Sequence, residues 1–327
     1  MLKKSRCDGS PIRDLPAFTL LMPYVMPDKT GSMIYYEQDL DVTDTLKHIK
    51  AVNRGFIKAG KILTLFEVVI CAAVRTIAMR PRANRFISGN RFYQRNQIVF
   101  NFVAKRELSD EGEEVNVKIP FEPSETLGSV AEKVGRYVRQ AVSEDGMAND
   151  AVVETLVKLP HFALNLVAKG LLWLDRHNLM PADLIESDPC FCSIFLTNVG
   201  SFGLETPFHH LYERGNCPIF IAMGKVRTVR ELEADGSVKE RQRLLLRYSF
   251  DDRIADGTYM GKTLGLIQGF VEDARLLDEP PELSPELLAE LRLKPAEPGP
   301  GGPAGDQETR SSSPSSARSP SSQARLR

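Results

Sequence analysis

One stretch of the sequence has the residue types of a catalytic hydroxyl site. It runs from Ile194 to Gly203 and reads IFLTNVGSFG. Its apolar residues predict a buried strand that ends at Thr197, followed by a glycine-containing turn. This order is typical of a hydroxyl held at the mouth of a cleft. It is equally typical of a simple turn with capping side chains, and both interpretations stay open at this point.

A second stretch concentrates charge between a predicted strand and a predicted helix. Tyr248–Gly257 reads YSFDDRIADG and places Asp251, Asp252 and Asp256 around Arg253. Carboxylates can act as acids and bases, and an arginine can hold one of them in an ion pair. Capping of the following helix is the alternative explanation for the same residues.

Two adjacent histidines, His209 and His210, follow Thr197 by about a dozen residues. A histidine titrates near neutral pH and is therefore a candidate general base. We hypothesise that one of the two reaches a site at Thr197. The alternative is that they pack or cap at a subunit contact. Joint metal binding is disfavoured, because side chains of neighbouring residues point apart.

No motif predicts a phosphate or a metal site. Gly257–Thr263 reads GTYMGKT and has three residues between its glycines, where a P-loop has four. No G-x-G-x-x-G follows a predicted strand. Cys190 and Cys192 form C-x-C with no histidine at zinc-ligand spacing. Five scattered cysteines are best explained as reduced thiols in a cytosol, and we expect no metal.

Charge and hydropathy exclude two classes of partner. The chain has 42 Lys+Arg and 43 Asp+Glu, a net charge of −1, which argues against a basic nucleic-acid-binding protein. The longest apolar stretch, Ile62–Met79, contains Glu67 and Arg75 and predicts a buried helix rather than a membrane span. We therefore expect a cytoplasmic protein with no nucleic-acid and no membrane partner.

The elements that position these residues alternate irregularly between strands and helices. The single tryptophan, Trp173, is expected in the core. Periodicity and turn residues predict strands over Met33–Val42, Gln97–Lys105, Val115–Pro120, Ser193–Thr197 and Ile219–Val226, hairpins over Phe86–Tyr93 and Thr228–Phe250, and helices over Asp44–Ala59 (capped by Asp44), Thr64–Met79, Ser129–Val142, Ala151–His177 and Thr258–Asp273. Without regular βαβ alternation, this order favours an α+β sandwich in one compact domain.

Composition sets the domain boundaries. Residues 1–20 are expected to be an N-terminal extension, 21–283 the main domain and 284–294 a short helical or extended connector. Residues 295–327 are rich in Pro, Gly and Ser and lack aromatic residues, which predicts a disordered tail. The Ser-Pro pairs of this tail are alternatively a partner or modification site.

Together and in this order, the two stretches resemble a known family. Leu196–Gly200 is similar to the hydroxyl-Asn-aliphatic-Gly stretch of the 2-oxo acid dehydrogenase acyltransferases (dihydrolipoyl acyltransferases). Ser249–Gly257 is similar to their S-x-D-H-R-x-x-D-G signature except at one position. The resemblance covers roughly residues 20 to 280. It implies a two-layer α+β sandwich of the chloramphenicol acetyltransferase type, with a mixed sheet and helices.

The resemblance also implies roles for single residues. In this family a histidine removes the proton from a thiol of coenzyme A or dihydrolipoamide, and the thiolate attacks a thioester. A hydroxyl then donates to the tetrahedral oxyanion, and Thr197 takes that role here. Asp256 is a structural end of the histidine loop, and Arg253 is an ion-pair partner for a carboxylate. Active sites between subunits imply a homotrimer, with CoA or acyl-CoA as a substrate.

This sequence departs from the family pattern at the histidine itself, where it has Asp252. Proton transfer from a thiol to an ordinary aspartate is uphill by about 6 kcal/mol, against about 3 kcal/mol for a histidine. The resemblance therefore implies a CoA-dependent acyltransferase homologue with altered or lost activity. A non-catalytic trimeric assembly or CoA-binding protein is the alternative, and thioester hydrolysis is a weaker one.

The acceptor is expected to come from outside the chain. The sequence shows no lipoyl domain and no small subunit-binding domain before the core, so we expect no covalent lipoyl group. An acyl acceptor would then be a free small molecule or part of a separate lipoyl- or acyl-carrying protein.

Overall fold

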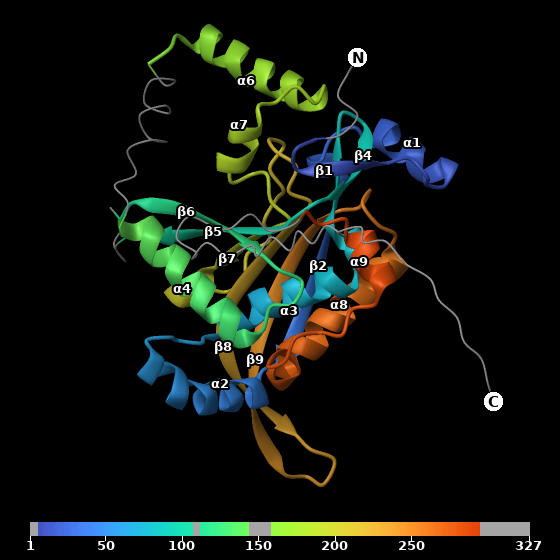
Figure 1. The fold of residues 1–327 in the computed structure, drawn as a ribbon. Helices are drawn as coiled ribbons and strands as arrows, with labels where there is room; N and C mark the ends of the chain where they lie inside the picture. Colours follow the sequence, from blue (N-terminus) through green and yellow to red (C-terminus); the bar gives the residue numbers. More distant parts are fainter. Residues whose placement is uncertain (1–5, 107–111, 144–157, 295–327) are drawn as a thin grey trace, which may run out of the picture. The chain divides into compact units, whose positions relative to one another are not determined.

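The structure, a computed structural model, describes residues 6–106, 112–143 and 158–294 (Figure 1). The predicted tail, residues 295–327, lies outside the described residues, as does part of the helix predicted over Ala151–His177. Met1–Lys294 makes up one compact unit. The predicted boundaries at residues 20 and 283 stay predictions.

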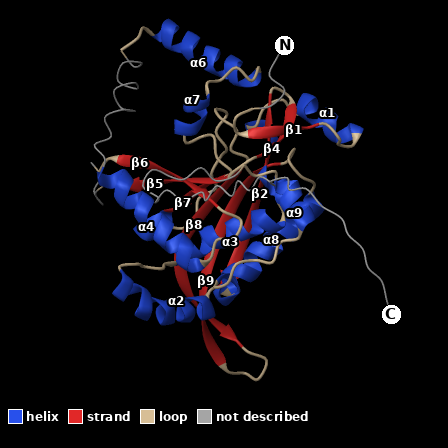
Figure 2. Ribbon diagram, viewed as in Figure 1, coloured by secondary structure: helices blue, strands red, loops and turns tan. Residues whose placement is uncertain are grey.

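A mixed six-stranded sheet forms the centre of the fold (Figure 2). Its strands are β2 (Met33–Asp41), β5 (Ile98–Lys105), β6 (Glu114–Phe121), β7 (Ile194–Asn198), β8 (Ile219–Leu232) and β9 (Val238–Asp251). They lie in the order β2-β9-β8-β7-β5-β6. Only β7 runs parallel to its neighbours, and every other pair is antiparallel.

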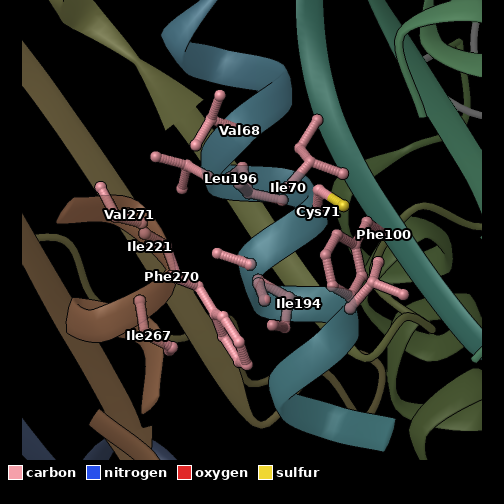
Figure 3. Close-up of a cluster of buried hydrophobic side chains, with 14 of the residues drawn as sticks. Val68, Ile70, Cys71, Phe100, Ile194, Leu196, Ile221, Ile267, Phe270 and Val271 are labelled. Carbon is pink, nitrogen blue, oxygen red and sulfur yellow. The ribbon is translucent and has the colours of Figure 1, made fainter. Parts of the chain in front are cut away.

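Helices pack against one face of this sheet. They are α2 (Thr43–Phe56), α3 (Leu65–Met79), α4 (Leu127–Ser143) and α8 (Gly257–Glu272). The core contains buried apolar residues from α3, α4, α8 and the strands. Figure 3 shows the centre of this core, where Cys71 of α3 lies near Phe100 of β5 and Phe270 of α8 approaches from the other side. The predicted α+β class, with a mixed sheet and helices, is confirmed.

The predicted helix over Thr64–Met79 is present as the central helix α3, and it begins at a capping box. Thr64 is its N-cap and accepts a hydrogen bond from the Phe66 amide, while the Glu67 carboxylate accepts one from the Thr64 amide. Arg75 donates from its two terminal guanidinium nitrogens to backbone carbonyls, including those of Glu125 and Glu279. The two charges inside this apolar helix are thus compatible with burial, because each has polar partners.

Three predicted details need correction. The cap of α2 is not Asp44: the helix begins at Thr43, whose amide donates to the Asp41 carboxylate at 3.0 Å. The predicted strand Ile219–Val226 and the first arm of the next hairpin are one continuous strand, β8. Within the described residues, the helix predicted from Ala151 begins only at residue 161, after a proline that fits the start of a helix.

A second, three-stranded sheet lies beside the first. It consists of β1 (Gly9–Ile12), β4 (Arg91–Arg95) and β3 (Arg85–Ser88), in that order. Gly89 and Asn90 join β3 to β4 with positive φ angles of 54° and 59°, as a tight two-residue hairpin turn requires. The predicted hairpin is therefore confirmed, and Gly9–Ile12 of the predicted extension pairs with its second strand.

Among the residues that the structure describes, the contacts that anchor helix α6 (His161–Arg176) lie at its C-terminal end. Its one buried residue is Asp175, which forms an ion pair with Arg6 at 2.7 Å. At the same end, a Cβ on Gly89 would lie 2.0 Å from the Arg176 carbonyl oxygen, so the hairpin turn touches the helix backbone directly. The expectation of a buried Trp173 is wrong, because it is 53% exposed and stacks only on His177.

Shorter helices complete the described fold. They are α1 (Ala17–Val25), α7 (Ala182–Ser187) and α9 (Pro285–Leu291). The last of these falls in the predicted connector and places Leu291 in the core. Across the described ranges, no helix is both long enough and apolar enough to span a membrane.

The face of the main sheet opposite the helices carries a smaller apolar cluster. It consists of Val99, Cys192, Phe195, Leu211, Cys217 and Phe220. The connection from β7 to β8, residues 199–218, supplies two of these side chains and so packs on this face. His209 and His210 lie in the same connection.

Candidate functional site

Strand β7 presents the Thr197 hydroxyl on the sheet face opposite the helices. Side chains alternate along a strand, and Phe195 packs in the small cluster on that face while Leu196 packs in the helix-side core. Thr197 is therefore on the same side as Phe195. It is half-buried, and its hydroxyl makes no hydrogen bond to any described residue. This hydroxyl is available to donate to a ligand.

The turn after Thr197 depends on a close backbone contact. A Cβ on Gly200 would lie 2.2 Å from the Gly224 carbonyl oxygen of β8. A Cβ on Gly224 would in turn lie 2.2 Å from the Thr206 hydroxyl. Glycine at both positions lets the connection press onto the sheet beside the Thr197 hydroxyl.

The turn from β9 to α8 is held by two of the predicted site residues. Arg253 donates to both oxygens of Asp251, at 2.8 and 2.7 Å, and also to the Met26 carbonyl at 2.8 Å. Asp256 is the N-cap of α8 and accepts from the Tyr259 amide at 2.9 Å. Both residues therefore stabilise the turn.

Asp252, which the sequence resemblance implies at the family's histidine position, lies exposed between these two supports. Its amide donates to the Ser32 carbonyl at 2.9 Å, but its carboxylate makes no hydrogen bond to any residue that the structure describes. Partial burial and the neighbouring charge of Asp251 raise the pKa of the Asp252 carboxyl above its usual value. A raised pKa makes the Asp252 carboxylate a stronger base, as proton removal from a thiol requires. A carboxylate nevertheless carries a negative charge in the form that accepts the proton, unlike an imidazole.

Within one chain, the structure does not bring Thr197 and Asp252 together. Thr197 pairs with Ala222 of β8. The Asp251 amide instead donates to the carbonyl of Pro218, which lies four residues before Ala222 and directly precedes β8. Four residues are about 13 Å along a strand, and β7 and β9 are two strand spacings, about 10 Å, apart. A site that contains both side chains would therefore need two copies of the chain.

His209 lies on the same sheet face as Thr197. Its ring stacks on Phe220 at a centroid distance of 3.8 Å, and Phe220 is level with Phe195, two residues before Thr197. The Nδ1 atom of His209 lies 2.7 Å from the His210 carbonyl oxygen. When Nδ1 carries the proton and donates to that carbonyl, Nε2 keeps its lone pair, as a general base requires.

Electrostatics favour the neutral form of His209. Its partial burial lowers the pKa of the imidazole below the usual value. His210 is more exposed, and its Nδ1 lies 3.0 Å from the Leu211 carbonyl. Of the two adjacent histidines, only His209 stacks on a side chain of the sheet.

Sequence reasoning missed a buried lysine beneath the Asp252 turn. Lys29 donates from Nζ to the Tyr212 and Gly215 carbonyls, at 2.7 and 2.9 Å, and burial lowers the pKa of its amine. The Glu213 carboxylate accepts from the Lys29 and Thr30 amides. A lone lysine in a Pro/Gly loop carries no sequence signal of such a role.

A pocket of about 500 Å³ opens beside this lysine. The loop 27–31, the hairpin turn 87–90, the end of α6, Glu213 and Arg253 line it. Among the residues that the structure places, no group of three or more His, Cys, Asp or Glu side chains is arranged to hold a metal ion. The expectation that the protein binds no metal therefore stays a prediction.

Comparison with known proteins supports the resemblance. Residues 183–278 match the family model described as 2-oxoacid dehydrogenases acyltransferase (catalytic domain). This segment contains Thr197, both adjacent histidines and the whole Asp252 turn. No curated protein matches the chain.

Two solved structures with TM-scores above 0.5 share the fold at low sequence identity, and a third structure is similar at a lower score. A probable dihydrolipoamide acetyltransferase from Listeria monocytogenes is 16% identical, with a TM-score of 0.52, covering 80% of this chain and 94% of its own. The dihydrolipoamide acetyltransferase of Azotobacter vinelandii is 15% identical, with a TM-score of 0.51, covering 82% and 94%. A chloramphenicol acetyltransferase is 14% identical, with a TM-score of 0.48, covering 81% and 98%.

Proposed function

We propose that this chain, whose residues 183–278 match an acyltransferase catalytic domain, transfers an acyl group from a CoA thioester to a thiol. The observation that carries the proposal is the arrangement of two groups on one face of the sheet. The Thr197 hydroxyl has no partner among the described residues, and His209 stacks about 7 Å away along the strand direction, two residues earlier. A thioester between them would meet a hydroxyl donor and a neutral imidazole.

In the proposed reaction His209 replaces the missing family histidine as the base. Its Nε2 accepts the proton of the acceptor thiol, and the thiolate attacks the thioester carbonyl carbon. The Thr197 hydroxyl donates to the oxyanion of the tetrahedral intermediate. The carbon–sulfur bond to CoA then breaks, and the CoA thiolate takes the proton back from the imidazolium.

A relative of similar fold supports the choice of residue types. The Azotobacter vinelandii enzyme was investigated for the role of a serine, a histidine and an asparagine in its catalytic mechanism, the asparagine four residues after the histidine. In this chain the hydroxyl is Thr197, and the pair with that spacing is Asp252 and Asp256. The hydroxyl chemistry is thus retained, whereas the histidine is not.

The separation of Thr197 from Asp252 within one chain supports a homotrimer. Copies arranged around an axis would cover this face of the sheet, and a second copy could bring its Asp252 turn toward Thr197. CoA or acyl-CoA is then the small-molecule substrate. The acceptor would be a free thiol or a lipoyl group on a separate protein in the cytoplasm.

One observation favours a second candidate function. Asp252 is an exposed carboxylate with no hydrogen bond to a described residue, and a carboxylate repels a forming thiolate. A non-catalytic assembly or CoA-binding protein would tolerate this substitution. Binding of CoA with a measurable Kd but no turnover would support that candidate.

The test is an acyl-transfer assay from acetyl-CoA to dihydrolipoamide, with CoA release followed in the absence of an acceptor. The proposal predicts activity in the wild type and in H210A, which is the matched control. H209A should be inactive, and T197V should lose about 10²- to 10³-fold in kcat. CoA release without an acceptor would indicate hydrolysis instead of transfer.

Asp252 substitutions distinguish the candidates further. If D252H creates activity in an inactive protein, the wild type is non-catalytic along the family mechanism. If the wild type is active, D252A is inactive and H209A is unchanged, the carboxylate is the base and His209 is not. The proposal requires D252A to retain activity that H209A loses.

A further inference from the structure

Two helices at one end of the described fold expose apolar side chains to solvent. We call this region the α1–α6 surface, and both helices lie at the end that carries the small sheet (Figure 1). Its members are Phe18, Leu21, Tyr24, Val25, Phe162, Leu166 and Trp173, each more than half exposed. Large exposed apolar patches mark interaction sites in soluble proteins.

Helix α6 has the pattern of an amphipathic helix with its apolar side uncovered. Phe162, Leu166 and Trp173 fall on one stripe, because they are spaced by four and seven residues. Asn165, Lys169 and Arg176 form an adjoining polar stripe. In a globular protein the apolar stripe of such a helix normally faces the core, but here its first two members are 77% and 72% exposed.

The exposed charge on these two helices is positive. Helix α1 contains no charged residue. Helix α6 exposes Lys169 and Arg176, neither of which forms an ion pair with a described residue, while its only acid, Asp175, is buried against Arg6. A basic amphipathic helix with Phe, Leu and Trp on its apolar side is typical of a helix that lies on a membrane surface.

A pocket beside α1 adds apolar and basic side chains at this end of the fold. Its volume is about 570 Å³, and Leu20 and Tyr24 of α1 line it together with Phe92 of the small sheet. Arg13 and Arg91 also line it. Asp14 offsets the charge of Arg13, so the cationic excess of the region comes from Arg91 and α6.

We propose that the α1–α6 surface binds an anionic phospholipid bilayer as a peripheral contact. Phe162, Leu166 and Trp173 enter the interface between headgroups and acyl chains. Lys169 and Arg176 reach the lipid phosphates, with their aliphatic stems along the apolar stripe. This proposal revises the sequence-based expectation of no membrane partner, and it is independent of the acyl-transfer proposal.

Charge favours a bilayer over a two-fold contact with a second copy of the chain as the occupant. A two-fold contact would bring this same surface of two copies together. The Lys169 and Arg176 side chains of both copies would then lie in one interface, with no exposed acid of α1 or α6 to offset them, which is unfavourable. An anionic lipid surface complements the same two charges.

Trp173 makes the test direct, because it is the only tryptophan in the 327-residue chain and lies on α6 itself. The full chain is titrated with vesicles of phosphatidylcholine and phosphatidylglycerol, and with phosphatidylcholine vesicles as the control. We expect a saturable blue shift of the emission with the anionic vesicles, together with quenching by brominated acyl chains. Added salt should weaken the binding.

Variants that keep Trp173 test the residues. K169Q and R176Q should each weaken the partition coefficient about fivefold, as expected for one cation near an anionic bilayer. F162S combined with L166S should abolish the blue shift. The matched control is L232S with V238S at the tip of the β8–β9 hairpin, where both side chains are equally exposed but lie far from α6 in the sequence. This pair should bind as the wild type does.

Three outcomes overturn the proposal. Equal binding to neutral and anionic vesicles would contradict the role of charge. An unchanged partition of F162S/L166S, in protein whose circular dichroism matches the wild type, would contradict the role of α6. A blue shift that depends on protein concentration without vesicles would identify a second copy as the occupant, and light scattering would show its size.

Discussion

Arg253 donates two parallel hydrogen bonds to the Asp251 carboxylate, at 2.8 and 2.7 Å, and both side chains are at most 3% exposed. The pair fixes the first residues after β9. Asp252, the next residue after Asp251, consequently lies on a rigid turn while its own carboxylate stays in solvent. Its position can therefore be tested separately from the stability of the turn.

Removal of the arginine should unfold the protein more easily. R253M leaves the Asp251 carboxylate buried without its partner, and we expect the free energy of unfolding to fall by about 3–5 kcal/mol. Urea unfolding followed by circular dichroism measures the change. The control D252N, one position away, should stay within about 0.5 kcal/mol of the wild type. Equal effects of the two variants would contradict the description of the turn.

A methyl group at Gly200 should disturb the Thr197 turn. Because the new Cβ would lie 2.2 Å from the Gly224 carbonyl oxygen, the backbone must move, and we expect G200A to cost about 1–3 kcal/mol. The control G265A lies in α8, where a Cβ meets nothing within 4 Å, and should stabilise the protein by about 0.4–1 kcal/mol. Thermal unfolding of both variants checks the prediction, which a stable G200A would refute.

The N-terminal residues should contribute strongly to stability. Arg6 forms ion pairs with Asp8 at 2.8 Å and with Asp175 at 2.7 Å, and its side chain is 1% exposed. R6M should therefore lower the free energy of unfolding by about 3–5 kcal/mol, since it leaves two buried carboxylates without this partner. The exposed R13M is the control and should stay within about 0.5 kcal/mol. Denaturant unfolding of the full chain decides between them.

The proposed base sets the acid side of the pH–rate profile. Burial lowers the pKa of His209 below the usual 6.5, and a base must be deprotonated to act. As the pH falls from neutrality, kcat/KM should therefore persist to below about 6.5 before it declines. F220L removes the stacking partner of the His209 imidazole and should change the pH at which kcat/KM declines on the acid side. A profile that changes in D252N but not in F220L would instead indicate the carboxylate.

Local patterns made much of the fold predictable. The capping box at Thr64 and the hairpin turn at Gly89 and Asn90 depend on residues close in sequence, and both are present in the structure. The apolar run before Thr197 likewise predicts its strand. Long-range pairing was not predictable: Lys29 and the Glu213 carboxylate are 184 residues apart, and no local signal connects them.

The candidate site was predictable in its residues but not in its geometry. The motifs identify Thr197 and Asp252, yet only strand register shows that one chain keeps them apart. Trp173 was expected in the core but is 53% exposed. Hydropathy reports what a side chain prefers, whereas its partner depends on the whole fold.

The described contacts of α6 hold its C-terminal end more firmly than its N-terminal end. Its last turn is fixed by the Arg6–Asp175 ion pair and by the backbone contact at Gly89, while the Phe162 end has little to hold it. The N-terminal end of the helix is therefore expected to move more than the C-terminal end. Amide hydrogen exchange should therefore slow progressively from His161 to Arg176. A displacement of the Phe162 end would be transmitted to the small sheet through the contact between Arg176 and the Gly89 turn.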